Sequence, residues 1–347
     1  MRLRLISVTF AIVGLVLAAC GGSTTAPAAT AAATTAATAA ATAAATEAPG
    51  TKTFVISQGD SGVANIPTLV ARDELNAKGW NVKVVQVKDV SLSVDGMTRG
   101  EFQFGRGAVN AYMLAIQKGA PLKIIQQAVN NEWTFYTKES ITKCAEIDGK
   151  KLAISSEGGV STAITRNWIN QECPTAKPSY LVIANSSDRF AALLSGQIDA
   201  SPLATEDGTL LEEKGGTKFR KLADFARDLP NLETTMFAVN GDWAKQNPGS
   251  VQAFLRAHLE SQRRIATESN YLAQMIEKYK SELSTTPSPK TIDAYKAKWK
   301  INGINEKDMQ YTLDFFTKSG AIQPGLTLAQ CTDLSYLDAV LAAIGKK

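Results

Sequence analysis

From residue 53 onward, short apolar runs alternate with longer stretches in which apolar residues recur every three or four positions. Runs of four to eight apolar residues are typical of strands, and the longer spacing is typical of helices. The predicted strands are 54–56, 82–87, 102–104, 122–129 and 134–137, with helices over 65–79, 93–99 and 108–118 between them. Strands that alternate with helices form mostly parallel sheets covered on both faces, so the pattern predicts an α/β fold.

The same alternation resumes after residue 147. It predicts strands over 151–155, 180–184 and 198–203, helices that begin at Ser161 or Thr162 and at Ser187, and a last strand over 236–239. From residue 247 the chain is almost entirely helical in pattern. A chain of 347 residues is too long for one small core. We therefore expect two doubly wound lobes joined by two crossings, one formed by 52–137 with 233–347 and the other by 138–232.

The N-terminus carries an apolar run from Leu5 to Ala19 after Arg2 and Arg4. This run is too short to span a bilayer comfortably and predicts a signal peptide over 1–19. It ends in Leu17-Ala18-Ala19-Cys20, which resembles the lipobox of bacterial lipoproteins. The resemblance implies that Cys20 carries a lipid anchor, with diacylglycerol and palmitate, on the extracytoplasmic side of the cell membrane. The alternative is an ordinary export signal in which Cys20 is incidental.

Residues 20–51 are almost entirely Ala, Thr, Pro, Gly and Ser after the cysteine. Such a segment has no large side chains to bury and cannot offset the entropy lost on ordering. Alanine favours helix, but the threonines with Pro27 and Pro49 oppose it. We expect a flexible tether, and a structural helix is the alternative.

Three cysteines follow the anchor, and no two of them have the C-x-x-C spacing of a metal site. Cys144 precedes the strand at 151, and Cys173 follows the helix after that strand. Because the strand and the helix run in opposite directions, both cysteines are expected at the sheet end away from the ligand. An exported chain can keep a disulfide, so we predict a Cys144–Cys173 bridge, with two buried thiols as the alternative. The role of Cys331 stays open.

The catalytic groups of common enzymes are missing. The single histidine, His258, lies in a predicted helix and is expected to be partly exposed. One such histidine leaves no Ser-His-Asp triad, Cys-His pair or histidine metal site. Residues 105–110 approach the G-x-G-x-x-G dinucleotide motif, but Asn110 replaces its last glycine, which favours a helix start that offers backbone N–H groups to a ligand. We expect binding rather than turnover, with no cofactor and no metal.

Ligands of doubly wound sheets bind beyond the carboxyl ends of the strands. This rule selects five loops, at 58–61, 105–107, 157–161, 185–188 and 205–207. Trp133 lies near the first crossing, where its ring could stack on a ligand, although a core position is the alternative. The candidate ligand-binding residues are Asp60, Ser61, Arg106, Trp133, Glu157, Ser161, Asn185 and Glu206. For any single residue the alternative is a turn or a helix cap.

Three segments of the chain resemble a known family. They are 107–123, which ends in Gln-Lys-Gly-Ala-Pro-Leu-Lys, 147–154 with the glycine pair that follows, and 189–200. They are similar to segments of the substrate-binding proteins for nitrate, sulfonates, taurine and thiamine precursors. The resemblance implies a type II periplasmic-binding-protein fold with a hinged cleft, a monomer, and an ABC transporter permease as partner. Enzyme relatives that make a thiamine pyrimidine depend on a first-lobe histidine, which this sequence lacks.

The ligand is the least constrained expectation. The predicted loops hold five carboxylates but only Arg106 and Arg189 as cations, and a site for a small anion favours excess positive charge. The sequence therefore points to a heteroaromatic vitamin, riboflavin first or a thiamine-related pyrimidine. The alternatives are a small anion such as taurine, another sulfonate or nitrate, a pyrimidine-synthase-like enzyme, and a surface lipoprotein without ligand. The net charge of +4 falls to +2 without Arg2 and Arg4, which argues against nucleic acid.

Overall fold

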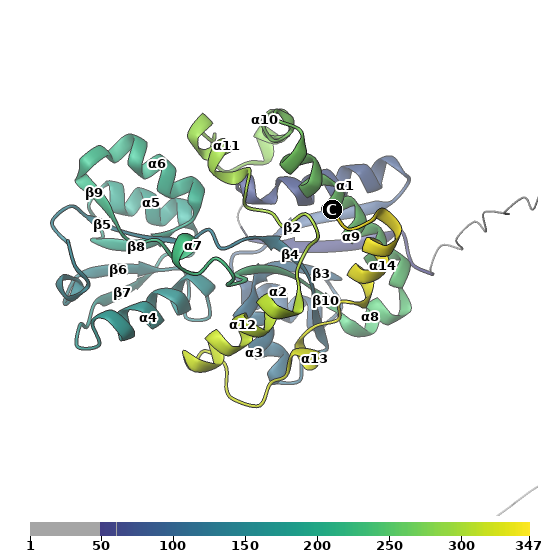
Figure 1. Cartoon of the computed structure of the whole chain (residues 1–347), viewed down its shortest axis with the longest axis horizontal. Helices are drawn as coiled ribbons and strands as arrows, with labels where there is room; N and C mark the ends of the chain where they lie inside the picture. The colour runs from purple at the N-terminus through teal and green to yellow at the C-terminus, as the bar shows by residue number, and fades with distance from the viewer. Residues whose placement is uncertain (1–48, 60) are drawn as a thin grey trace, which may run out of the picture. The chain divides into compact units, whose positions relative to one another are not determined.

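A computed structural model describes residues 49–59 and 61–347. The predicted signal peptide, Cys20 and Asp60 lie outside the described residues. The two sheets belong to one compact unit, Glu47–Lys347 (Figure 1). In the described part of the chain, no helix is both long enough and apolar enough to cross a membrane.

The first sheet has the strand order β2-β1-β3-β10-β4. Its strands are β1 (Thr53–Gln58), β2 (Asn81–Gln86), β3 (Phe104–Ala108), β4 (Leu122–Val129) and β10 (Thr235–Asn240). β1 pairs in parallel with β2 and β3, whereas β10 runs antiparallel to both β3 and β4. The helices between these strands are η1 (Val63–Asn65), α1 (Ile66–Ala77), α2 (Val90–Thr98) and α3 (Val109–Gln117). This part of the protein, with the helical tail described below, is called lobe I.

The second sheet has the order β7-β6-β8-β5-β9 and forms the centre of lobe II. Its strands are β5 (Thr134–Lys138), β6 (Lys151–Ile154), β7 (Ser179–Val182), β8 (Ala200–Leu203) and β9 (Phe219–Ala223). Its helical segments are η2 (Cys144–Ile147), α4 (Val160–Glu172), α5 (Ser186–Leu194), α6 (Thr205–Gly215), η3 (Gly216–Lys218) and α7 (Phe225–Asp228). The chain passes between the sheets at 130–133 and again at 229–234.

The tail is helical, as its pattern predicted, and packs mainly around the first sheet (Figure 1). It contains α8 (Gly241–Gln246), α9 (Pro248–Thr267), α10 (Tyr271–Tyr279), η4 (Lys280–Glu282), α11 (Pro289–Tyr295), α12 (Glu306–Lys318), α13 (Leu328–Cys331) and α14 (Ser335–Ile344). Phe254 of α9 packs on Phe104 and Phe237, with ring centroids 4.8 and 5.0 Å apart. Aromatic side chains from helix and sheet therefore form the centre of this core.

The expectation that His258 is partly exposed is wrong. His258 lies one turn after Phe254, on the same face of α9, and is fully buried 4.9 Å from the Phe237 ring. Burial, followed by the positive charge of Arg106, lowers the pKa of this imidazole to about 3. The side chain is therefore neutral at physiological pH.

Residues 105–107 form part of strand β3, not the predicted loop. The antiparallel partner β10 pairs with them, with Phe237 opposite Arg106. A Cβ atom on Gly105 or Gly107 would lie 2.7 or 2.9 Å from the Tyr112 hydroxyl. These glycines are explained by the close approach of a side chain, and not by a turn.

Two other segments differ from the sequence-based expectation. Strand β9 was not predicted, because its charged Arg220 and Lys221 interrupt the apolar pattern at the edge of the sheet. The expected tether also ends earlier than residue 51. Gly249 donates to the Pro49 carbonyl at 2.9 Å, and Thr51 donates to the Asn247 side chain at 2.9 Å. Residues 49–51 therefore already belong to the folded part.

The structure joins Cys144 and Cys173 in a disulfide, with Cα atoms 5.7 Å apart. The bridge links η2 to the end of α4 and closes a loop with a sequence separation of 29 residues. Cys331 is a buried free thiol, and burial raises its pKa to about 11. This thiol is therefore protonated and unreactive at neutral pH.

Candidate functional site

A cavity of about 170 Å³ lies between the two lobes. Its walls come from segments that follow β1, β2, β6, β7 and β8, which is where the rule for doubly wound sheets places ligands. Lobe I and the first crossing contribute Gly59, Lys88, Asp89, Ser93, Arg106, Glu132, Trp133 and Thr235. Lobe II contributes Ser155, Ser156, Gly159, Ser161, Asn185, Ser186, Arg189 and Ala204.

Five helices begin at this cavity. The residue before the first turn of each one lines it, namely Asp89 (α2), Ala108 (α3), Gly159 (α4), Asn185 (α5) and Ala204 (α6). Asp89 caps its own helix by accepting from Ser91 N at 2.7 Å. The other four starts have no side-chain cap. Helix starts present unpaired N–H donors and a partial positive charge, so this convergence favours an anionic or acceptor-rich group.

Two arginines add positive charge. Arg106 of β3 is buried, lines the cavity and donates to the Ala64 carbonyl at 3.3 Å. Arg189 of α5 is fully buried and donates to the carbonyls of Ile183, Ala184 and Pro202 at 2.7 to 3.1 Å. It also lies 5.8 Å from the Trp133 ring. Arg189 thus holds the loop after β7 against β8, and its guanidinium packs against the Trp133 ring.

The carboxylates gather in a smaller pocket next to the cavity. This side pocket, of about 40 Å³, is lined by Glu132, Glu206, Asp207 and Tyr295, with Arg106 between it and the main cavity. The Tyr295 hydroxyl donates to Glu132 at 2.5 Å. Burial, and next the negative charge of Glu132, raise the pKa of Tyr295. Two of the carboxylates expected around the ligand, Glu206 and Asp207, therefore line the side pocket instead, whereas Glu132 lines both pockets.

The structure places the predicted ligand residues differently. Arg106, Trp133, Ser161 and Asn185 line the main cavity together, whereas Glu206 lines only the side pocket. The prediction for Asp60 lies outside the described residues.

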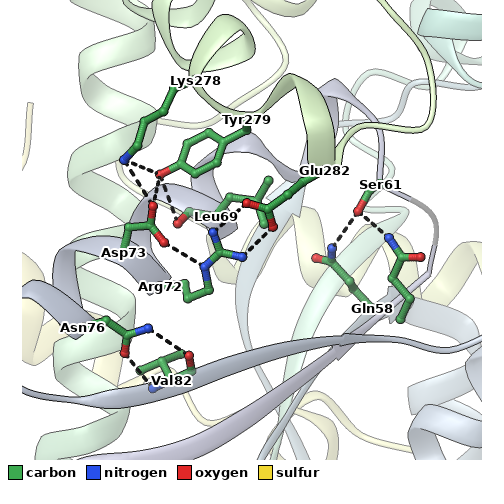
Figure 2. Close-up of polar contacts among 11 residues, drawn as sticks. Gln58, Ser61, Leu69, Arg72, Asp73, Asn76, Val82, Lys278, Tyr279 and Glu282 are labelled. Carbon is green, nitrogen blue, oxygen red and sulfur yellow. Dashed lines mark hydrogen bonds and ion pairs between the residues drawn. The ribbon is translucent and has the colours of Figure 1, made fainter.

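Two predicted residues do not line the main cavity. Ser61 faces a neighbouring pocket and accepts from Gln58 and Gln86, at 3.4 and 2.7 Å (Figure 2). Glu157 is exposed and pairs with Arg166 of α4 at 2.6 Å. Glu157 lines a different pocket, to which both lobes contribute residues, so its role at the ligand stays a prediction.

Sequence reasoning missed several polar residues of the cavity wall. Ser155 and Ser156 follow β6 directly, so the rule about strand ends could have found them. Glu132 is next to Trp133 at the first crossing, so the position at the crossing that pointed to Trp133 could also have pointed to Glu132. Ser93 faces the cavity from inside α2 and bonds to Ser57 at 2.7 Å, an arrangement that no sequence pattern reveals.

A family model described as NMT1/THI5 like matches residues 63–268, well over half of the chain. The chain belongs to this family. The match includes lobe I from η1 to β4 and from β10 to α9, all of lobe II and both crossings, and it confirms the resemblance seen in the sequence. No curated protein matches the chain.

Solved structures share the fold at low sequence identity. The periplasmic nitrate-binding protein NrtA from Synechocystis PCC 6803 has a TM-score of 0.68 and 14% identity, covering 86% of this chain and 90% of that protein. The alkanesulfonate-binding protein SsuA from Xanthomonas axonopodis pv. citri, bound to MOPS, has a TM-score of 0.63 and 15% identity over 83% and 100%.

A Candida albicans protein, CA3427, has a TM-score of 0.62 and 13% identity over 84% of this chain and 95% of that protein. It is described as having the generic periplasmic binding protein fold. The periplasmic-binding-protein fold expected from the sequence is thereby confirmed.

Proposed function

We propose that this protein is the solute-binding component of an ABC importer and that its ligand is a small anion of the sulfonate or nitrate class. The observation that carries the proposal is the convergence of four helix starts without a side-chain cap, together with Arg106, on one cavity. Backbone N–H groups and a guanidinium are the donors that bind oxyanions most strongly. Family membership and the folds of the nitrate- and sulfonate-binding proteins support the transport role.

The size of the cavity supports a small ligand. Its volume of about 170 Å³ is below the roughly 300–1,000 Å³ typical of sites for drug-sized molecules. Taurine, methanesulfonate and nitrate are much smaller than a flavin. The tricyclic ring and ribityl chain of riboflavin would not fit in this cavity. A wider and more open pocket of about 800 Å³ shares Asp89 and Ser156 with it.

The chemistry of the cavity supports binding rather than catalysis. The only histidine of the chain, His258, is buried in the core of lobe I and does not line the cavity. A synthase of the thiamine-pyrimidine type requires a histidine that reaches its substrate. The polar wall consists of hydroxyls, an amide, helix starts and five charged side chains, namely Lys88, Asp89, Arg106, Glu132 and Arg189.

A second candidate ligand is a thiamine-related pyrimidine, and Trp133 favours it. The indole lines the cavity, and its buried Nε1 has no hydrogen-bond partner among the described residues. A flat ring could stack on this side chain or accept from its N–H group. The volume of the cavity favours a pyrimidine over riboflavin within the heteroaromatic class.

Isothermal titration calorimetry of the chain without its signal peptide tests the proposal. The probes are taurine, methanesulfonate, nitrate, a hydroxymethylpyrimidine and riboflavin. We expect at least one anion to bind, and Arg106→Met to weaken it about 10- to 100-fold, the range for losing a charged hydrogen bond. Arg166→Met is the matched control, because Arg166 pairs with Glu157 outside the cavity. Binding of only the heterocycles, or equal effects of the two arginine variants, would contradict the small-anion proposal.

A further inference from the structure

Glu206 belongs to lobe II but bonds to lobe I. It lies in the first turn of α6, is 5% exposed, and accepts from the backbone N–H of Val63 at 2.9 Å. The Thr285 hydroxyl, also in lobe I, donates to the other carboxylate oxygen. One buried carboxylate therefore joins two separate segments of the opposite lobe.

The Val63 N–H group is a helix-start donor. Val63 opens η1, which continues directly into α1, and the preceding residue, Gly62, has no side chain to cap it. An acceptor at this position is normally supplied by a Ser, Thr, Asp or Asn of the same segment. Here the carboxylate of Glu206 supplies it from the other lobe, and its negative charge suits the positive end of the helix.

Gly62 makes room for this contact. A Cβ atom at Gly62 would lie 2.6 Å from Glu206 Oε2, and among the described residues the only other atom within 4 Å belongs to the same carboxylate group. The backbone of Gly62 is extended, with φ −103° and ψ −174°, which any residue can adopt. The glycine is therefore required by the carboxylate of the opposite lobe and not by its own conformation.

The receiving surface is held together within lobe I. Ser284 donates to the Ser61 carbonyl through its backbone at 2.7 Å and through its hydroxyl at 2.8 Å. Figure 2 shows how Arg72 of α1 binds Glu282 at 2.6 and 2.9 Å and so holds the following segment against α1. The Val63 and Thr285 donors thus form one preformed binding position for a carboxylate on lobe I.

We propose that Glu206 is a positioning residue that couples ligand binding to closure of the lobes. Ala204, which lines the main cavity, lies two residues before Glu206 at the start of α6. A ligand that draws this start towards lobe I therefore stabilises the contact that the carboxylate already makes with the Val63 and Thr285 donors, and with it the closed form. The inference rests on the proposed function only in its choice of a small anion as the ligand that drives closure. Because Glu206 already occupies the N–H donor at the start of η1 and α1, the anionic group of the ligand binds at the other helix starts.

A double-mutant cycle tests the coupling with Gly62→Ala, Glu206→Ala and the variant that combines them. We expect Gly62→Ala to weaken binding of the best anion probe about tenfold, and less than about twofold when Glu206 is already alanine. Glu206→Gln keeps an acceptor of the same length and should retain most of the affinity. Gly158→Ala is the matched control: its carbonyl meets Asn110 of lobe I at 3.0 Å, but its Cβ position is open.

Two readouts separate this inference from the proposed function. Small-angle X-ray scattering should show a smaller ligand-induced fall in radius of gyration in Gly62→Ala than in the native protein, and equal falls in Glu206→Ala and in the combined variant. If no probe binds, the proposed function fails, and the same cycle measured by thermal unfolding of the ligand-free protein decides the inference. Additive effects of the two substitutions, in binding or in unfolding, would overturn it.

Discussion

Protonation of His258 offers a test of the packing behind the cavity. The imidazole is fully buried, and its two nitrogens have no hydrogen-bond partner among the described residues. Burial lowers its folded pKa to about 3 from an ordinary value of 6.5. Below pH 6.5 the unfolded chain therefore binds a proton that the folded protein does not, and stability is lost as pH falls from 6.5 towards 3.

The magnitude follows from this difference. At pH 4.5 the unfolded imidazole lies two pH units below its pKa, while the folded one is still neutral. At about 1.4 kcal/mol per unit, His258 alone should lower the free energy of unfolding by about 3 kcal/mol between pH 7 and pH 4.5. His258→Leu removes this proton and keeps an apolar side chain of similar size against Phe237.

Urea unfolding followed by tryptophan fluorescence measures the effect in the native protein and in His258→Leu at both pH values. The carboxylates titrate alike in the two proteins, so their contribution cancels in the difference. The variant should lose about 3 kcal/mol less than the native protein on acidification. Parallel pH profiles would refute the reasoning and would mean that the imidazole can charge in the folded state.

Three further predictions concern the anchor, the disulfide and the wall of lobe II. Cys20→Ser should release the protein from membranes into the soluble fraction, and unchanged membrane retention would contradict lipidation. Replacing Cys144 and Cys173 by alanine should lower the free energy of unfolding by about 3–4 kcal/mol, the expectation for a loop of this size, whereas an unchanged melting temperature would contradict the bridge. Arg189→Leu leaves three carbonyls without their donor and should cost about 3 kcal/mol in denaturant unfolding, while a loss below 1 kcal/mol would contradict its role.

The order of strands and helices could be predicted because each element buries an apolar pattern of its own period. Strand β4 has the bounds that its apolar run predicted, and β10 differs by one residue at each end. β3 was placed too early because its glycines have the same signature as a turn. Their true cause is the close approach of helix side chains: the Tyr112 hydroxyl lies near both positions, and Ser93 Oγ lies nearer still to Gly105. His258 was misjudged because only the packed structure shows which face of α9 meets the sheet.

The candidate site was predictable where it depends on strand ends and not where it depends on how the lobes meet. Ser161 and Asn185 follow strands and line the cavity, as the general rule requires. Glu206 also follows a strand, but its partner is Val63 of lobe I, 143 residues away in the chain. The sequence therefore shows that this residue is charged, but not that its carboxylate bonds to lobe I instead of lining the main cavity. This contact takes one of the five expected carboxylates away from the main cavity.

The central claim is that helix starts and Arg106 hold a small anion between the lobes. A crystal structure of the protein with the tightest-binding anion of the titration series tests it most directly. We predict oxyanion density in the main cavity, within hydrogen-bond distance of Arg106 and of backbone N–H groups at the starts of α4 and α5. An anion bound elsewhere on the surface, with an empty cavity or a heterocycle stacked on Trp133, would contradict the claim.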